Sequence, residues 1–305
     1  MDRLESLRFF IRLVEKKGIA SAGQDFGMSP ATATNRLAEL EAYYEAKLIN
    51  RTTRSISLTE EGWVLFNKSR SLVEESDDLR NQIRLGTQDI SGSIRISAPQ
   101  DLGQNFIAPL LDEFLKIYPD IRIELLLADS HLDLVGSGID LSVRLGHLKD
   151  SSLKSRKLAE NRRIVCASPD YLKKFGTPLH PTDLVNHNCL IMHWGRIIDR
   201  EWNFQVDGRN HAIAITGNRA SNNGAQVKDW CLHGHGIAFK SIWDVKQHLA
   251  SGELVELLGE YSSQKPTALQ ILYPGGYRPS RRVRVLIDFL VECFENRTKF
   301  EQGFT

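Results

Sequence analysis

The chain has 305 residues, of which 41% are hydrophobic and 25% charged, and its formal net charge is +1. This length and composition fit a folded chain of more than one domain and exclude a disordered one. No run of about 20 apolar residues could span a membrane. The first 18 residues are charged throughout and lack the apolar core of a signal peptide, so we expect a cytoplasmic protein.

Cysteine and histidine usage argues against a metal centre or a disulfide framework. The four cysteines lie far apart, and neither a CxxC motif nor the histidine spacing of a zinc site occurs. We therefore expect reduced, mostly buried thiols and no metal. The four are Cys166, Cys189, Cys231 and Cys293.

Residues 1–58 predict three short helices followed by a β-prone segment. Apolar residues recur at helical spacing before Gly18, namely Leu4, Leu7, Ile11 and Val14. A second helix is expected at about residues 21–26. Ser29 can cap the third, and Pro30 suits its first turn. This third helix is expected to end near Tyr44.

The third helix has an unusual outer face. Its core face is predicted from apolar spacing as Ala33, Leu37, Leu40 and Tyr44. The opposite face carries small or short polar side chains, namely Ala31, Thr34, Asn35 and Ala38, with Thr32 at the border. The DNA major groove admits such a helix: Ala and Thr methyls can meet thymine methyls, and Asn can pair with adenine. Close packing against another helix is the alternative explanation for these small residues.

The order of a short helix, a turn and a second helix predicts a helix-turn-helix. The next residues, Arg51 to Arg54, read RTTR and offer guanidinium and hydroxyl groups to backbone phosphates. Residues 1–58 carry nine Lys or Arg against seven Asp or Glu. Affinity for DNA is therefore expected to come from the placement of Arg36, Arg51 and Arg54, and not from a strongly basic domain.

A long helix is expected from Thr59 to about Leu85, with Thr59 as its cap and about 40 Å in length. Leucines seven residues apart form a seam along it, at Leu58, Leu65, Leu72 and Leu79. Such a seam is suited to pairing with another helix, although Ser69 and Ser76 interrupt it. We expect two chains to pair here; packing against the chain's own N-terminal domain accounts for part of the seam.

From about residue 93 the sequence alternates between strand and helix patterns to about Asn296. SIRISA and IRIELLLA are expected as strands, and FIAPLLDEFLKIYPD and SHLDLVGSG as helices. A β-rich stretch is expected from Trp202 to Thr216. This alternation predicts α/β layers with mostly parallel sheets.

Residues 9–62 resemble the N-terminal domain of LysR-type transcriptional regulators. The similarity lies in the helix-turn-helix, an L-x-x-L-E within the recognition helix, LINRTTR leading into a wing, and SLTEEG opening a linker helix. The segments GSIRISAPQDLG, APLLDEFLKIYPDIRIELLL, DLVGSGIDLSVRLG and ASPDYLKKFGTP are similar to the effector domain of that family. Family members often have Ser where Thr34 stands and Gln or Arg where Asn35 stands, which leaves the preferred bases open.

The resemblance implies an α/β protein overall, with an all-α winged helix-turn-helix domain at residues 1–58 and a dimerising linker helix at 59–88. Residues 89–305 would form a two-lobed effector domain like periplasmic binding proteins. Lobe I would take about 89–162 and 268–300, and lobe II about 163–267.

The residues and the resemblance together predict the sites. The expected DNA contacts are Ala20, Ser21, Ser29, Pro30, Ala31, Thr32, Thr34, Asn35, Arg36, Arg51, Thr52, Thr53 and Arg54. The expected effector contacts are Ser97, Ala98, Pro99, Gln100, Ala128, Asp129, Arg144, Gly146, Ser221 and Asn222. The expected dimer contacts are Leu65, Leu72 and Leu79.

The resemblance also implies the partners. These are double-stranded DNA with an interrupted palindrome, a small organic effector such as a carboxylate, and further copies of the chain as a dimer or dimer of dimers. RNA polymerase is a possible partner, and a membrane is not expected.

Other function classes fit the sequence less well. There is no G-x-S-x-G elbow, Walker A loop or HExxH, so we expect neither an enzyme nor a cofactor. Gly234-His235-Gly236 is weak evidence for nucleotide binding, and we expect His235 to be a surface turn residue. Trp202 is expected to pack inside the second lobe. A cytoplasmic small-molecule-binding protein without a regulatory role is the alternative, but the helix-turn-helix argues against it.

Overall fold

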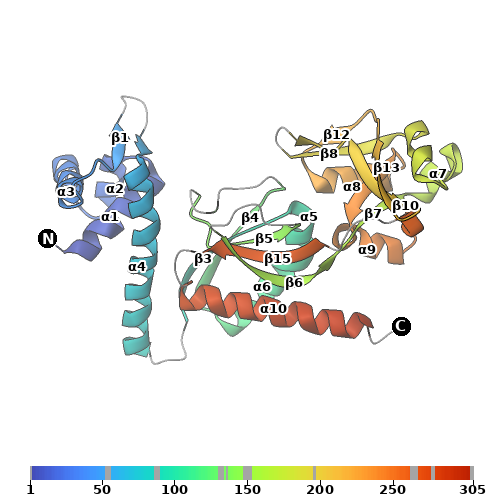
Figure 1. Ribbon diagram of the computed structural model, residues 1–305. Coiled ribbons are helices and arrows are strands. Elements are labelled where there is room, and N and C mark those ends of the chain that lie inside the picture. Colours follow the sequence, from blue (N-terminus) through green and yellow to red (C-terminus); the bar gives the residue numbers. More distant parts are fainter. Residues whose placement is uncertain are drawn as a thin grey trace.

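The computed structural model places an N-terminal domain and a long helix beside a two-lobed domain (Figure 1). The residues that it describes are 2–51, 56–85, 90–129, 134, 137–146, 153–194, 197–261, 267–275 and 279–302. Within these residues, no helix is both long and apolar enough to cross a membrane. All four cysteines are free thiols, and three of them are buried.

The N-terminal domain has three helices and a hairpin, as predicted. They are α1 (Arg3–Lys16), α2 (Ile19–Asp25), α3 (Pro30–Tyr43), β1 (Ile49–Arg51) and β2 (Ile56–Leu58), the two strands being antiparallel. Phe9, Phe10 and Leu13 of α1 pack against Leu37 and Leu40 of α3 in one core.

The expected core position of Tyr44 is wrong. This residue follows the last turn of α3 and is 41% exposed, with its ring edge-on to that of Tyr43. The apolar spacing of α3 continues to residue 44, but the helix ends at Tyr43, so Tyr44 no longer faces the core.

The long helix α4 (Glu60–Leu85) begins where the sequence predicts. The Thr59 hydroxyl caps it by accepting the N–H of Gly62 at 2.9 Å. Its inner face joins the N-terminal core through Phe66 and Val73, and Asp77 accepts a hydrogen bond from Arg8 Nη1 of α1 at 2.8 Å. The N-terminal domain is therefore fixed to this helix as far along as Asp77.

We call lobe I the part built on a five-stranded sheet in the order β4-β3-β5-β15-β6. Its strands are β3 (Gly92–Ala98), β4 (Ile121–Leu127), β5 (Leu141–Leu145), β6 (Leu153–Asn161) and β15 (Thr267–Pro274). A continuous helical segment follows β3: α5 (Gln100–Leu102), the π-helical η1 (Gly103–Ile107) and α6 (Ala108–Ile117). Together with α10 (Arg281–Gln302), this segment encloses the largest core. In Figure 1, α10 runs along the underside of the lobe.

We call lobe II the part built on the sheet β12-β8-β13-β7-β14. Strand β9 lies beside β8, and β10 and β11 form a separate hairpin. The strands of this lobe are β7 (Arg163–Ala167), β8 (Cys189–Trp194), β9 (Ile197–Ile198), β10 (Glu201–Val206), β11 (Arg209–Ala214), β12 (Ala220–Ser221), β13 (Ile237–Ser241) and β14 (Val255–Leu257). Its helical segments are α7 (Pro169–Phe175), η2 (Pro181–Asn186), α8 (Gly224–Leu232), α9 (Ile242–Ala250) and η3 (Gly259–Tyr261). Trp202 is 1% exposed and packs on Phe239, as expected.

The expectation of mostly parallel sheets is wrong. In each main sheet two neighbouring strand pairs are parallel and two are antiparallel. The chain leaves lobe I through β6, enters lobe II through β7, and later returns to lobe I through β15. Of these strands, β7 and β15 run against the parallel strands of their sheets, and local alternation of strand and helix carries no information about strand direction. The helix expected at SHLDLVGSG lies mostly outside the described residues.

The linker is joined to lobe I by an ion pair. Arg70 Nη2 of α4 lies 3.5 Å from Asp140 Oδ1, at the start of β5. The backbone N–H of Arg95 in β3 donates to the other carboxylate oxygen at 2.7 Å. Asp140 thus holds α4, β3 and β5 together. The predicted domain and lobe boundaries themselves stay predictions.

Candidate functional site

The outer face of α3 is accessible at the residues expected to read DNA. Ala31, Thr32, Asn35 and Ala38 are exposed, while Leu37 is fully buried beneath them. The backbone N–H of Thr32 donates to the Ser29 hydroxyl at 3.2 Å, which fixes the first turn. Burial of the inner face therefore holds a helix whose outer face includes the poor helix formers Thr32 and Asn35.

The structure shows which group Thr34 can offer. Its hydroxyl donates to the carbonyl of Pro30 at 2.9 Å within the helix. The hydroxyl oxygen can still accept a hydrogen bond, and the methyl group is suited to a thymine methyl. Asn35 follows it with an exposed amide that can form two hydrogen bonds to a base.

The remaining expected DNA contacts are only partly described. Ala20 is exposed on α2, and the Ser21 hydroxyl donates to the carbonyl of Gly18 at 3.0 Å. Arg36 is half-buried on α3. Arg51 ends strand β1. Thr52, Thr53 and Arg54 lie outside the described residues.

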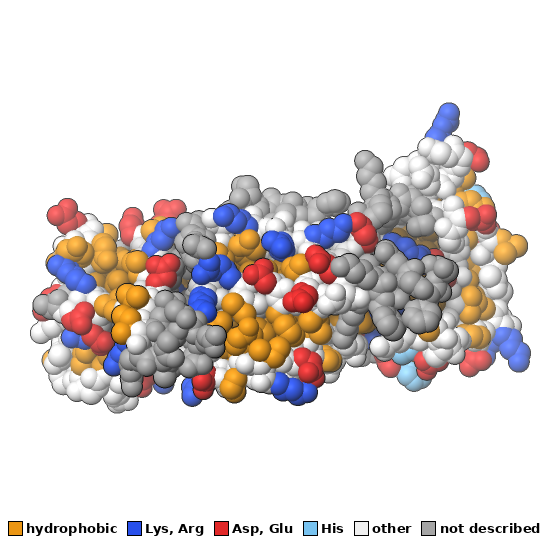
Figure 2. Space-filling model, turned by 90° about the horizontal axis from the view of Figure 1, so that it is seen from below, with side chains coloured by type: hydrophobic (Ala, Val, Ile, Leu, Met, Phe, Trp, Pro, Cys, Tyr) orange, Lys and Arg blue, Asp and Glu red, His pale blue; other side chains and the backbone are white. Residues whose placement is uncertain are grey.

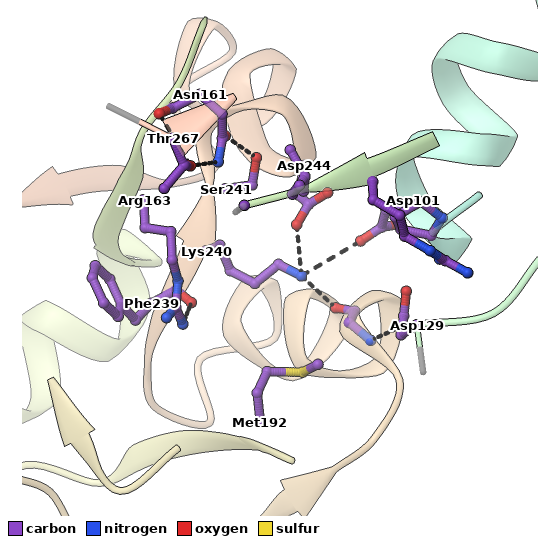
Figure 3. Close-up of a pocket in the computed structure, with 15 residues that line it drawn as sticks. Asp101, Asp129, Asn161, Arg163, Met192, Phe239, Lys240, Ser241, Asp244 and Thr267 are labelled. Atoms are coloured by element: carbon purple, nitrogen blue, oxygen red, sulfur yellow. Dashed lines mark hydrogen bonds and ion pairs between the residues drawn. The ribbon is translucent and has the colours of Figure 1, made fainter. Parts of the chain in front are cut away.

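A cavity of about 330 Å³ lies between the two lobes (Figure 3). Its lining comes from strand ends and helix starts of both lobes: Pro99, Asp101, Asp129, Arg144, Leu145, Gly146, Asn161, Arg163, Met192, Gly224, Phe239, Lys240, Ser241, Asp244 and Thr267. Four of the expected effector residues are among them, namely Pro99, Asp129, Arg144 and Gly146. A cavity of this size is suited to a small molecule.

The other expected effector residues lie beside the cavity and do not line it. Ser97 and Ala98 are fully buried. The Ala128 carbonyl accepts a hydrogen bond from Arg144 Nη1 at 2.7 Å. Ser221 and Asn222 flank the start of α8, where the Ser221 hydroxyl accepts the N–H of Asn223 at 3.1 Å.

The expected role of the Ser97 hydroxyl therefore needs correction. It donates to Ser142 Oγ at 2.7 Å and lies 3.3 Å from Arg144 Nη2. Ser97 supports Arg144 from behind, because β3 and β5 are neighbours in the sheet. Sequence order placed it next to the cleft, but strand alternation turns its side chain into the lobe.

Arg144 is the most unusual cation of the cavity. It is only 6% exposed, and its two described hydrogen bonds go to uncharged oxygens of Ser97 and Ala128. Within the described part of the chain it makes no ion pair with a carboxylate. Burial lowers the pKa of Arg144, and the charge of Asp129 opposes that shift. A buried guanidinium of this kind favours an anionic neighbour.

Sequence reasoning missed a buried charge cluster in the same cavity. Lys240 Nζ lies 2.9 Å from Asp244 Oδ2 and 3.8 Å from Asp101 Oδ2, and donates to the carbonyl of Gly224 at 3.0 Å (Figure 3). Lys228 Nζ donates to Asp101 Oδ1 at 2.7 Å. Burial acts to lower the pKa of Lys240, but Asp244 and Asp101 together raise it above its ordinary value. The signal available in the sequence was a lysine within IAFKS, a strand whose residues are all buried.

Both helix starts at the cleft already hold carboxylate or amide oxygens of the chain. Asp129 accepts the N–H groups of Gln100 and Gly224, at 2.9 and 2.6 Å. Asn223 Oδ1 accepts those of Ala225 and Gln226, at 2.9 and 3.2 Å. Among the described residues, no group of three His, Cys, Asp or Glu side chains could hold a metal ion.

Models of one protein family match both the N-terminal part of the chain and its two-lobed part. The bacterial regulatory helix-turn-helix model of the lysR family matches residues 4–63, and the LysR substrate binding domain model matches residues 87–295. The chain belongs to the LysR family of transcriptional regulators. It is thus a ligand-responsive DNA-binding regulator, and the unregulated binding protein is not favoured.

Individual relatives extend this similarity along the whole chain. The HTH-type transcriptional regulator DmlR of Escherichia coli K12 is 34% identical over 291 residues, 95% of this chain and 94% of DmlR. The HTH-type transcriptional activator TtdR of the same strain is 29% identical, over 98% of this chain and 96% of TtdR. The solved structure of CrgA, a LysR-type regulator from Neisseria meningitidis, is 30% identical. It aligns with a TM-score of 0.63 over 95% of this chain and 98% of CrgA.

Replacing Lys240 tests the buried charge cluster. Lys240→Met keeps the length of the side chain but leaves Asp101 and Asp244 without their shared cation. We expect lobe II to lose about 3–5 kcal/mol of stability, because a buried carboxylate without its partner is strongly destabilising. Hydrogen exchange of amides in β13 and α9 of the full chain measures this loss. Lys116→Met, at a residue whose side chain is 70% exposed, is the matched control and should change little. Equal exchange in the two variants would contradict the assignment.

Proposed function

We propose that α3 enters the major groove of double-stranded DNA and reads bases through Ala31, Thr34 and Asn35. The support is the outer face of this helix, where the exposed amide of Asn35 lies among small side chains. The helix start at Ser29 suits a phosphate. The RTTR segment after β1 binds backbone phosphates beside the groove. The protein performs this role on DNA in the cytoplasm.

Two chains pair along α4 in this proposal. The side chains of Val64, Leu72, Leu79 and Ile83 are 62%, 53%, 58% and 77% exposed, which is unusual for apolar residues on one helix. A hollow of about 410 Å³ lies beside Val64 and Leu72. Leu65 differs from the other expected dimer residues, since it packs partly on the N-terminal core. Pairing through α4 presents two recognition helices to the half-sites of an interrupted palindrome.

A second hydrophobic surface supports a dimer of dimers. Seen from below, hydrophobic side chains gather on the N-terminal side of the molecule and in a band beneath lobe I, where α6 and α10 lie (Figure 2). Ile117 at the end of α6 is 58% exposed, and Tyr118, Val285 and Phe289 are only partly buried. We assign this band to the contact between dimers. RNA polymerase, in this proposal, contacts the remaining surface of the DNA-bound assembly.

The effector in this proposal is a small organic anion, and a carboxylate is the simplest. The observation that supports this is Arg144, a buried guanidinium that lines the interlobe cavity and pairs with no described carboxylate. An anion that reaches Arg144 from the cavity would compensate its charge in a site largely shielded from water. Phe239 and Met192 on the facing wall offer apolar contact to the rest of the molecule.

The reading face of α3 is tested by separating base preference from overall affinity. Asn35→Ala should reduce discrimination between the preferred and the substituted base by about 1–3 kcal/mol, because the base loses a bidentate partner. Arg54→Ala should instead weaken binding to all sequences and reduce the salt dependence. Titration of matched DNA duplexes at several salt concentrations measures both. Unchanged selectivity in Asn35→Ala would refute the assignment of this face.

Pairing through α4 is tested by placing charge on its apolar seam. Leu72→Glu combined with Leu79→Glu should convert the dimer to a monomer, because four carboxylates would meet in the paired helices. Analytical ultracentrifugation measures the mass, and affinity for a palindromic duplex should fall with it. Glu75→Gln, at an exposed residue of the same helix, is the control. A double variant that remains dimeric through α4 would exclude this interface.

The nature of the effector is tested with succinate and other small carboxylates as probes. A probe at about 100 times its Kd should stabilise the parent chain by about 2.7 kcal/mol, seen as a rise in Tm. Arg144→Gln should abolish this rise, and the amide analogue of the same probe should produce none in the parent. A Tm rise that persists in Arg144→Gln, or one produced equally by the amide, would contradict an anionic effector at Arg144.

A further inference from the structure

Asp129 joins the two lobes through both oxygens of its carboxylate. It follows β4 of lobe I, and its Oδ1 accepts the N–H of Gln100, the first residue of α5, at 2.9 Å. Its Oδ2 accepts the N–H of Gly224, the first residue of α8 in lobe II, at 2.6 Å. One carboxylate therefore binds an amide of each lobe across the cleft.

This position is the one that an anionic ligand of the cleft would favour. N–H groups at the start of a helix attract negative charge, and the segment beginning at Gln100 continues through η1 and α6. Asp129 also opposes the fall in the pKa of Arg144, so its charge is felt by the buried cation of the cavity. The next two N–H groups of α8 are accepted by Asn223, so the amide of Gly224 is the one that meets lobe I.

Other contacts hold α8 beside Asp129. Lys228 of α8 donates to Asp101 of lobe I at 2.7 Å, and Lys240 donates to the carbonyl of Gly224 at 3.0 Å. A Cβ atom at position 224 would lie 2.8 Å from Lys240 Nζ and 3.4 Å from Asp129 Oδ2. Glycine at this position lets the lysine and the carboxylate both approach the backbone of this residue, at its carbonyl and its N–H.

We propose that Asp129 is an internal anion that fastens lobe I to lobe II and competes with the effector's carboxylate for the N–H groups of Gln100 and Gly224. The fastening rests on the hydrogen bonds alone, and the competition rests on the anionic effector proposed above. An effector that takes this position replaces the hydrogen bonds of Asp129 to Gln100 and Gly224 with its own hydrogen bonds to them. Its binding energy then differs between the fastened and the released arrangement, which is what a ligand needs to shift an equilibrium.

The experiment uses the full chain with Asp129→Ala and acetate as the probe. Removal of the carboxylate should make the amides of Gln100 and Gly224 exchange roughly tenfold faster, because each loses a charged acceptor. Tm should fall by about 2–4 °C for a domain of this size. Millimolar sodium acetate should restore both values, since its carboxylate fits the vacated position. Sodium chloride at equal ionic strength should not, and acetate should change the parent chain much less than Asp129→Ala, because Asp129 occupies the position there.

Asp129→Asn is the matched variant, because it keeps the shape and removes the charge. It should show intermediate exchange and no response to acetate, and it provides the same exchange test if Asp129→Ala does not fold. Amides of β3 in the lobe I core should exchange alike in all chains, which checks the fold. Unchanged exchange at Gln100 and Gly224 would overturn the fastening. Fast exchange without acetate rescue would overturn the anion position. Neither result depends on Arg144, whose variant tests the proposed effector separately.

Discussion

The contact between the two lobes depends on charges that have left water. Asp101 of lobe I is 5% exposed and meets Lys228 and Lys240 of lobe II, while Lys240 itself is 5% exposed. Burial of each ion alone would cost several kcal/mol, so the arrangement is favourable only when all partners are present together. An apolar interface would tolerate sliding between the lobes. Charged hydrogen bonds of defined geometry favour one relative position, and a ligand can compete for that position.

The need of a buried charge for an oppositely charged partner also links the cleft to the DNA-binding half of the molecule. Strand β5 carries Asp140 at its start, beside Arg70 of α4, and Arg144 at its end, in the cavity. Burial raises the pKa of Asp140, and Arg70 acts in the opposite direction, so the carboxylate depends on that cation to remain charged. Three residues of a central strand, 141–143, lie between the two groups. Because this strand is paired on both sides, it is a stiff connection between Arg144 in the cavity and the ion pair of Asp140 with Arg70 of α4.

Local sequence signals sufficed for the N-terminal half and not for the cleft. Ser29 and Thr59 cap the helices that they were expected to cap, because capping and apolar spacing act over one or two turns. Of the cleft, Arg144 and Asp129 could be predicted, since they lie at or just after the carboxyl ends of strands in a resembled family. Lys240 could not, because its carboxylate partner Asp101 lies far away in the sequence and meets it only after the chain has crossed between lobes. The direction of the strands could not be predicted either, because it also depends on where the chain crosses between the lobes.

The packing of α3 favours one of the two interpretations of its outer face that its composition leaves open. A face of Ala, Thr and Asn suits a groove or a neighbouring helix equally well, but within the described residues α3 packs with its other side on α1 and α2 and leaves this face exposed. The Thr34 hydroxyl donates its proton to the Pro30 carbonyl, so it can only accept a hydrogen bond from a base. In the proposed binding mode, Asn35 both donates to and accepts from a base, with methyl groups of Ala31 and Thr34 beside it. An amide flanked by methyl groups matches adenine next to thymine better than any guanine-rich sequence.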